Sequence, residues 1–305
     1  MRNLSVRNLF LLFLAAFIWG TAFVAQAVGM EHIGPFAFNA ARSFVGGIAL
    51  LPVIALFDRL KSPEKRAEER ANRKTLLLGG LCCGVVLCVA ANLQQVGIQY
   101  TAVGKAGFVT ALYIVIVPIL SLFLGRKAGG RLWVSVAIAV VGLYLLCMTG
   151  SLRLEKGDFF VLLCAFGFSI HILVIDHFSP KVDGVKMSCI QFFVAGLLSA
   201  VWMLFAEGAP AVHSVALSWA PILYAGILSS GVAYTLQIVG QKNVNPTLAS
   251  LILSLESVFS VLAGWVVLHQ SLSARELLGC LLMFGAIILA QLPERKKKEG
   301  PADRP

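Results

Sequence analysis

The chain has 305 residues, of which 58% are hydrophobic and 13% are charged, and its formal net charge is +10. Soluble domains contain about 25% charged residues, so this composition and a mean hydropathy of +0.86 exclude a soluble protein and indicate a polytopic membrane protein. The apolar runs lack the alternation of barrel strands, which predicts that the chain crosses the bilayer as α-helices.

Ten apolar stretches follow one another along the chain, each about long enough to cross a bilayer as a helix. The first stretch follows Arg2 and Arg7 and contains Ala25-Gln26-Ala27, so a cleaved signal peptide is an alternative at this position. The length of that run and the nine later spans favour a retained helix. We predict spans at residues 9–28, 34–57, 75–98, 103–124, 131–149, 158–176, 187–205, 218–239, 245–268 and 276–292.

Lysine and arginine are distributed unequally over the segments between these spans. Twenty lie in the amino-terminal segment and in the segments that share its side, whereas the opposite segments hold four, Lys105, Arg153, Lys156 and Arg275. The positive-inside rule therefore predicts a plasma-membrane protein with both termini in the cytoplasm. Because the basic residues flank apolar spans, we expect the lipid bilayer as a partner and no nucleic acid.

The two halves of the sequence resemble each other. Three pairs of segments match in the same order at similar offsets: 95–99 with 237–241 (offset 142), Arg131 with Arg275 (144), and Trp19-Gly20 with Phe166-Gly167 (147). These matches predict a duplicated unit of five helices, and an odd number of helices inverts the second copy in the membrane. The predicted organisation is a cytoplasmic amino terminus (1–8), a first repeat (9–149), an external linker (150–157), a second repeat (158–292) and a basic cytoplasmic tail (293–305).

Four features of the sequence resemble the EamA-type branch of the drug/metabolite transporter superfamily. They are IWGTAF at residues 18–23, Arg42 in the second span, GFVTALYIVIVP at 107–118, and Leu255-Glu256 before a long apolar run. The similarity extends from about residue 9 to residue 292. It implies an all-α membrane protein of ten transmembrane helices, arranged as two inverted five-helix repeats around a central cavity, and it implies export as the commoner direction of transport.

One acid and one base lie deep within the predicted spans. Ionisable groups in the bilayer core are costly, so Glu256 and Arg42 are expected to face protein or water rather than lipid. Glu256 is a candidate for proton coupling or for binding a cationic group, and a structural carboxylate bonded to a neighbouring helix is the alternative. Arg42 is a candidate for binding a substrate carboxylate, or else pairs with Glu256 or a helix carbonyl.

Polar and aromatic residues at helical spacing mark candidate cavity faces. Asn92 and Gln95 share one face of the third span, and Tyr234 and Gln237 share one face of the eighth. These spans occupy equivalent places in the two halves, as a pseudo-symmetric binding site requires. Three further candidates for substrate contact, for which packing is the alternative, are Trp19, Tyr113 and His171.

We therefore predict a secondary transporter that exports a small polar or amphipathic metabolite, such as an amino-acid-like solute or a drug. The alternatives are a membrane-embedded enzyme and a channel or scaffold without alternating access. The sequence contains no H-E-x-x-H or G-x-S-x-G motif and no paired buried acids, which argues against an enzyme. All seven cysteines lie in apolar spans without zinc-site spacing, and no nucleotide-binding loop is present, so no metal or other cofactor is expected.

Overall fold

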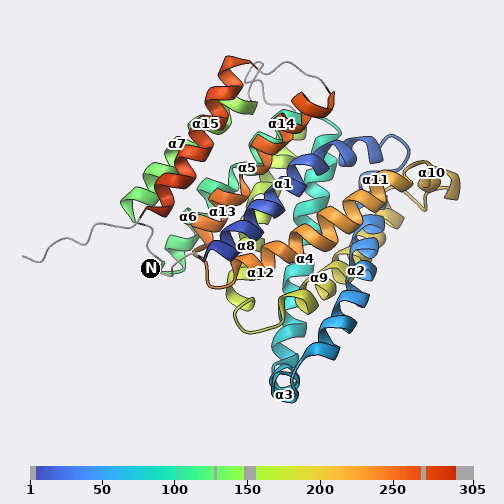
Figure 1. Cartoon of the computed structure of the whole chain (residues 1–305). Helices are drawn as coiled ribbons and strands as arrows, with labels where there is room; N and C mark the ends of the chain where they lie inside the picture. The colour runs from blue at the N-terminus through green and yellow to red at the C-terminus, as the bar shows by residue number, and fades with distance from the viewer. Residues whose placement is uncertain (1–4, 102, 127–128, 148–155, 269–272, 293–305) are drawn as a thin grey trace, which may run out of the picture.

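The structure is a computed structural model that describes residues 5–101, 103–126, 129–147, 156–268 and 273–292. These ranges are helical and contain no strand, as predicted (Figure 1). Residues 1–4, most of the predicted linker (150–155) and the predicted basic tail (293–305) lie outside the described residues.

The helices follow the predicted spans closely, with two short helices between them. In chain order they are α1 (Val6–Gly29), α2 (Pro35–Leu60), α3 (Pro63–Ala71), α4 (Arg73–Ile98), α5 (Val103–Ala111), α6 (Tyr113–Phe123), α7 (Gly130–Cys147), α8 (Lys156–Phe178), α9 (Gly184–Ala206), α10 (Val212–Leu217), α11 (Trp219–Leu223), the π-helix η1 (Tyr224–Tyr234), α12 (Thr235–Gln241), α13 (Pro246–Leu253), α14 (Glu256–Leu268) and α15 (Ala274–Gln291).

Eight helical stretches within the described ranges are long and apolar enough to cross a membrane. Two of them join several helices, since Lys105–Phe123 contains α6 and most of α5, and Trp219–Gln241 contains α11, η1 and α12. The predicted spans at 131–149 and 245–268 correspond to the shorter apolar stretches Gly130–Leu146 and Pro246–Leu262.

Helices α2 and α9 lie side by side and run in opposite directions (Figure 1). At one end Glu207, directly after α9, accepts hydrogen bonds from the backbone N–H groups of Phe36 (2.8 Å) and Ala37 (3.0 Å) in the first turn of α2. At the other end the ammonium of Lys61, directly after α2, lies 2.7 Å from a carboxylate oxygen of Asp183, the N-cap of α9. Contacts at both ends thus set the antiparallel arrangement of this pair.

Two other helix pairs approach closely at glycine. A Cβ atom on Gly84 of α4 would lie 2.8 Å from the carbonyl oxygen of Gln191 in α9, and one on Gly226 of η1 would lie 3.0 Å from the carbonyl oxygen of Arg42 in α2. Small residues permit such backbone approach within the membrane. Gly226 follows Gly84 by 142 positions and Gln191 follows Arg42 by 149. Packing of α4 on α9 therefore resembles packing of η1 on α2.

Two helical stretches, α5–α6 and α13–α14, are each interrupted near the centre by a tight 3₁₀ turn. Between α5 and α6 the N–H of Leu112 donates to the carbonyl of Val109, three residues back (3.2 Å). Between α13 and α14 the N–H of Leu255 donates to the carbonyl of Ile252 in the same way (3.2 Å). The sequence predicts residues 245–268 as one continuous helix, and the structure divides them into α13 and α14. A 3₁₀ segment within a helix often marks a hinge.

Candidate substrate cavity

A cavity with about 40 Å³ of free space lies between the helices near both interruptions. Seven of the nine predicted site residues line it: Trp19, Arg42, Tyr113, His171, Tyr234, Gln237 and Glu256. A water molecule needs roughly 10–15 Å³ of such space, so the cavity has room for about three waters and is too small for a solute of amino-acid size. In this structure the helices thus leave too little room for such a solute.

Glu256 and Tyr113 meet in the lining of this cavity. Glu256 is 6% exposed and Tyr113 is 4% exposed, so both are enclosed by protein. The phenolic hydroxyl of Tyr113 donates to Oε1 of Glu256 over 3.0 Å. Tyr113 is the first residue of α6 and Glu256 is the first residue of α14, so each directly follows one of the two interruptions. The interruptions thus position the bonded pair.

Arg42 lines the same cavity, from the α2 side, and is 4% exposed. Within the described part of the chain its guanidinium has no hydrogen-bond or ion-pair partner, and no ion pair joins it to Glu256. An acidic and a basic side chain therefore border one cavity without pairing with each other. This arrangement leaves the guanidinium able to bind an anionic group of a ligand.

Tyr234, at the end of the π-helix η1, is the centre of an aromatic cluster. Its ring contacts the rings of Trp19, His171 and Phe192 in edge-to-face geometry, at centroid distances of 4.6, 5.8 and 5.6 Å. Nε1 of Trp19 donates to the carbonyl oxygen of Ser229 over 3.2 Å, which fixes the indole against η1. These rings give the cavity one apolar wall with defined geometry.

Several side-chain amides border the cavity. Gln26 and Gln237 line it, and the side-chain oxygen of each is buried without a hydrogen-bond partner among the described residues. An unsatisfied buried oxygen costs about 1–3 kcal/mol, and a hydrogen-bond donor on a ligand would relieve that cost. Nε2 of His171 lies 3.1 Å from Oε1 of Gln191 in α9, so His171 already has a protein partner.

Asn92 and Gln95 lie outside the cavity lining and connect helices. The side-chain amide of Asn92 accepts from Asn39 in α2 (2.9 Å) and donates to Ser199 in α9 (2.8 Å). Nε2 of Gln95 donates to the backbone carbonyl of Gln26 in α1 (3.2 Å). In this structure both residues therefore serve packing between α4 and its neighbours.

Eight lining residues are not among the predicted candidates: Phe23, Gln26, Gln94, Thr110, Phe168, Ile172, Ser229 and Leu253. Some of them share a helical face with a predicted residue, since Phe23 and Gln26 follow Trp19 at i+4 and i+7, and Phe168 precedes His171 by three. Gln94 is adjacent to the predicted Gln95 and donates to Thr110 of α5 (3.2 Å).

Comparison with known proteins gives consistent results. The sequence profile of the EamA-like transporter family matches residues 7–148 and 155–292. The chain is 29% identical to an uncharacterized transporter of Archaeoglobus fulgidus over 92% of this chain and 84% of that one. It is 24% identical to the uncharacterized inner membrane transporter YedA of Escherichia coli, over 92% of this chain and 89% of YedA. It is 21% identical to the uncharacterized transporter YoaV of Bacillus subtilis, over 92% of this chain and 95% of YoaV. A protein of known crystal structure shares the fold, with a TM-score of 0.74 and 19% identity over 93% of this chain and 96% of its own.

Proposed function

Because the chain belongs to the EamA-like transporter family, we propose that it is a secondary transporter that moves a small polar or amphipathic solute through the cavity around Glu256. It is a multi-pass membrane protein, and its relatives bear the names of transporters, one of them of an inner membrane. The observation that carries the proposal is the placement of Arg42 and Glu256, unpaired with each other, on one cavity.

The proposed mechanism is alternating access between two inverted repeats of five helices. Three observations support the repeat: the family profile matches twice, α2 and α9 are antiparallel, and the contact of Gly84 with Gln191 resembles that of Gly226 with Arg42. Tyr113 and Glu256 are equivalent in this scheme, at offset 143, and each follows an interruption. Inverted repeats allow one half to rock against the other around a fixed central site.

Movement at the interruptions would open the cavity. Its free space of about 40 Å³ does not admit a solute, so transport requires the helices around it to separate on one side at a time. The 3₁₀ turns at Leu112 and Leu255 are the proposed hinges, because they are the points where regular helical bonding is already broken next to the central pair.

The charges and rings of the cavity favour a zwitterionic, amino-acid-like solute. The Arg42 guanidinium would bind a carboxylate with two parallel hydrogen bonds, and Glu256 and the unsatisfied oxygens of Gln26 and Gln237 would accept from an ammonium group. The rings around Tyr234 would contact the apolar part of the solute. A drug with a cationic amine would use the same groups on the Glu256 side.

The proposal also includes the orientation of the chain in the membrane, the direction of transport and its coupling to protons. Both termini are proposed to lie in the cytoplasm of a plasma-membrane protein, on the charge asymmetry of the sequence. Export is the proposed direction, because the resemblance to the family implies it. Glu256 is the proposed proton carrier if a proton gradient drives transport, since it is the buried acid of the cavity.

A flux assay with purified protein in liposomes tests the proposal. Labelled amino acids, nucleosides, sugars and cationic drugs are offered, and saturable movement of an unaltered solute is expected. Chemical conversion of the solute would indicate an enzyme, flux that does not saturate would indicate a channel, and no flux for any class would indicate a scaffold. For a zwitterion, Arg42→Gln is expected to raise the half-saturating concentration about 10- to 100-fold, which corresponds to one lost charge-assisted interaction. Arg7→Gln, which removes an exposed charge far from the cavity, is the matched control and should leave it unchanged.

A further inference from the structure

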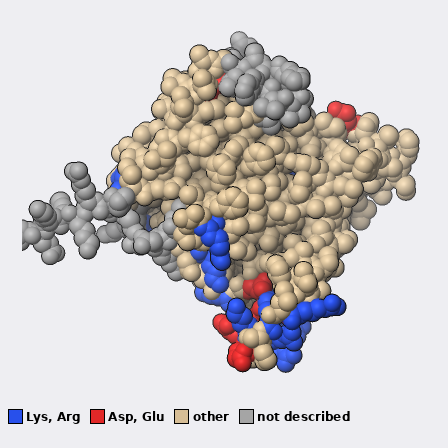
Figure 2. Space-filling view, in the orientation of Figure 1, with Lys and Arg blue, Asp and Glu red and all other residues tan. Residues whose placement is uncertain are grey.

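Four arginines line one groove at the end of the molecule that carries α3. Arg59 belongs to the last turn of α2, Arg66 and Arg70 to α3, and Arg73 is the first residue of α4. Figure 2 shows lysine and arginine gathered at this end, while most of the rest of the visible face carries no charge. We call this feature the arginine groove.

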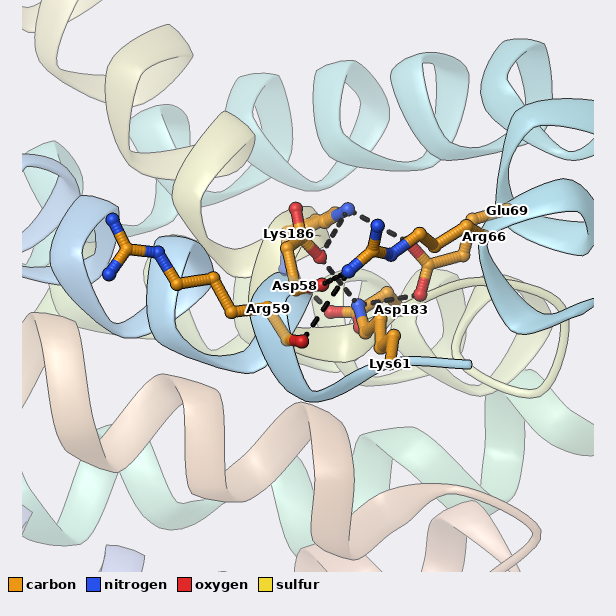
Figure 3. A network of polar contacts seen from close by, with 7 residues as sticks. All are labelled: Asp58, Arg59, Lys61, Arg66, Glu69, Asp183 and Lys186. Atoms are coloured by element: carbon orange, nitrogen blue, oxygen red, sulfur yellow. Dashed lines mark hydrogen bonds and ion pairs between the residues drawn. The ribbon is translucent and has the colours of Figure 1, made fainter. Parts of the chain in front are cut away.

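The acids of the groove are paired with lysine rather than with arginine. Asp58 and Glu69 also line the groove, and both contact the ammonium groups of Lys61 (3.0 and 2.6 Å) and Lys186 (2.9 and 2.8 Å). Figure 3 shows the two lysines between these carboxylates and that of Asp183. The three carboxylates are therefore paired with the two lysines, and the one negative charge that remains is small against the four arginines.

The arginines themselves lack acidic partners. Arg66 donates to the backbone carbonyl of Asp58 over 2.7 Å, which holds α3 against the end of α2. The side chain of Arg59 points away from the lysine–carboxylate network (Figure 3). Among the residues that the structure describes, no hydrogen bond or ion pair engages the side chains of Arg59, Arg70 or Arg73, and all three are exposed. Three neighbouring guanidinium groups without a counterion form a site for an anion.

Exposed leucines of α2 and α4 lie near the arginines of the groove along these two helices. Leu56 and Leu60 of α2 are 56% and 76% exposed, and Leu77 and Leu81 of α4 are each 49% exposed. Arg59 is adjacent to Leu60, and Arg73 is one turn from Leu77. By contrast α3 has no buried residue and has the polar sequence PEKRAEERA. The groove therefore lies where lipid-facing surface gives way to charged surface, at the depth of lipid headgroups.

We propose that the arginine groove binds the phosphate of an anionic phospholipid, whose acyl chains lie against the exposed leucines of α2 and α4. Guanidinium groups bind phosphate oxygens through paired hydrogen bonds, and a headgroup with net negative charge neutralises the cluster. Phosphate alone would satisfy the arginines, but the adjoining apolar surfaces fit acyl chains. A membrane lipid is therefore the ligand that matches both parts of the site.

Lipid retention by the purified full-length protein tests this proposal. Native mass spectrometry compares phosphatidylglycerol with phosphatidylcholine, and we expect preferential retention of phosphatidylglycerol. The triple variant Arg59→Gln, Arg70→Gln, Arg73→Gln should bind it about a hundredfold more weakly, about fivefold for each arginine. A control variant with the same loss of charge on the same side, Arg7→Gln, Lys65→Gln, Lys74→Gln, should retain it as the unmodified protein does. Equal losses in the two variants would overturn the proposal, because they would show attraction by net charge alone.

Two further measurements separate the remaining outcomes. A triple arginine-to-lysine variant at the same positions keeps the charge and should restore most of the binding, which excludes misfolding as the cause of a loss. Inorganic phosphate and glycerol phosphate are offered as soluble competitors and should not displace phosphatidylglycerol. If they displace it at equal concentration, the groove is a site for soluble anions and the lipid proposal is wrong.

Discussion

Replacement of Gly20 by alanine tests the packing of α1 on the helix that begins with Glu256. A Cβ at Gly20 would lie 2.6 Å from the carbonyl oxygen of Glu256, 2.6 Å from Cβ of Phe259 and 2.8 Å from the backbone N of Ser260. Ordinary contact begins at about 3.4 Å, so α1 and α14 would have to separate by about 0.8 Å. Two of the three atoms are backbone atoms that cannot rotate away. Overpacking of this kind costs up to about 3 kcal/mol, and alanine recovers about 1 kcal/mol of helix propensity. We expect a net loss of about 2 kcal/mol.

The free energy of unfolding is measured by reversible denaturant titration of the purified protein in mixed micelles. Gly285→Ala is the matched control, because Gly285 is exposed on α15 and a Cβ there would meet nothing within 4 Å. That variant should be neutral or up to about 1 kcal/mol more stable. Equal unfolding free energies for the two alanine variants would refute the packing of α1 against α14 described above.

Three other changes have expected outcomes in the same titration. Tyr113→Phe removes the hydroxyl that donates to Glu256 and should cost about 1–3 kcal/mol, and an unchanged stability would show that the bond does not form. Lys61→Met leaves its three carboxylates short of a partner and should cost about 1–3 kcal/mol, whereas Lys65→Met on exposed α3 should cost less than about 0.5 kcal/mol. Burial opposes ionisation of Asp183, but hydrogen bonds from Lys61 and from a backbone N–H of α9 outweigh it and hold the pKa of Asp183 below its usual value. The resulting stability is fully present above a pH of about 4 and is lost as the pH falls through the lowered pKa of the folded protein. Asp183→Asn should remove this acid-side decline, and an identical pH profile would contradict the assignment.

The spans could be predicted from the sequence because an apolar run of about 20 residues is a direct consequence of bilayer thickness. The interruption of residues 245–268 could not be predicted from the sequence, since neither glycine nor proline occurs at the break. The hydroxyl of Ser254 instead bonds to the carbonyl of Leu251 (2.8 Å) and competes with regular backbone bonding there. A serine in a helix can also point elsewhere, so sequence alone does not locate the turn.

The two buried charges of the cavity were predictable because ionisable residues are rare inside spans. The residues of α4 that line the cavity could not be predicted. Asn92, Gln94 and Gln95 are all polar and lie on adjoining faces, so any of them fits a cavity. The rotation of α4 is set by its packing on α8 and α9, where Gly84 approaches the backbone of Gln191. That contact turns Gln94, rather than the pair Asn92 and Gln95, toward the cavity.

Transport through the cavity that Glu256 borders is tested by measuring solute flux of the Glu256→Gln variant in proteoliposomes. The substitution keeps the shape of the side chain and its ability to accept from Tyr113. For a solute that the unmodified protein transports, we expect the variant to lose saturable flux and its dependence on pH. If the variant keeps both at the level of the unmodified protein, transport does not depend on this carboxylate and the proposed route is wrong.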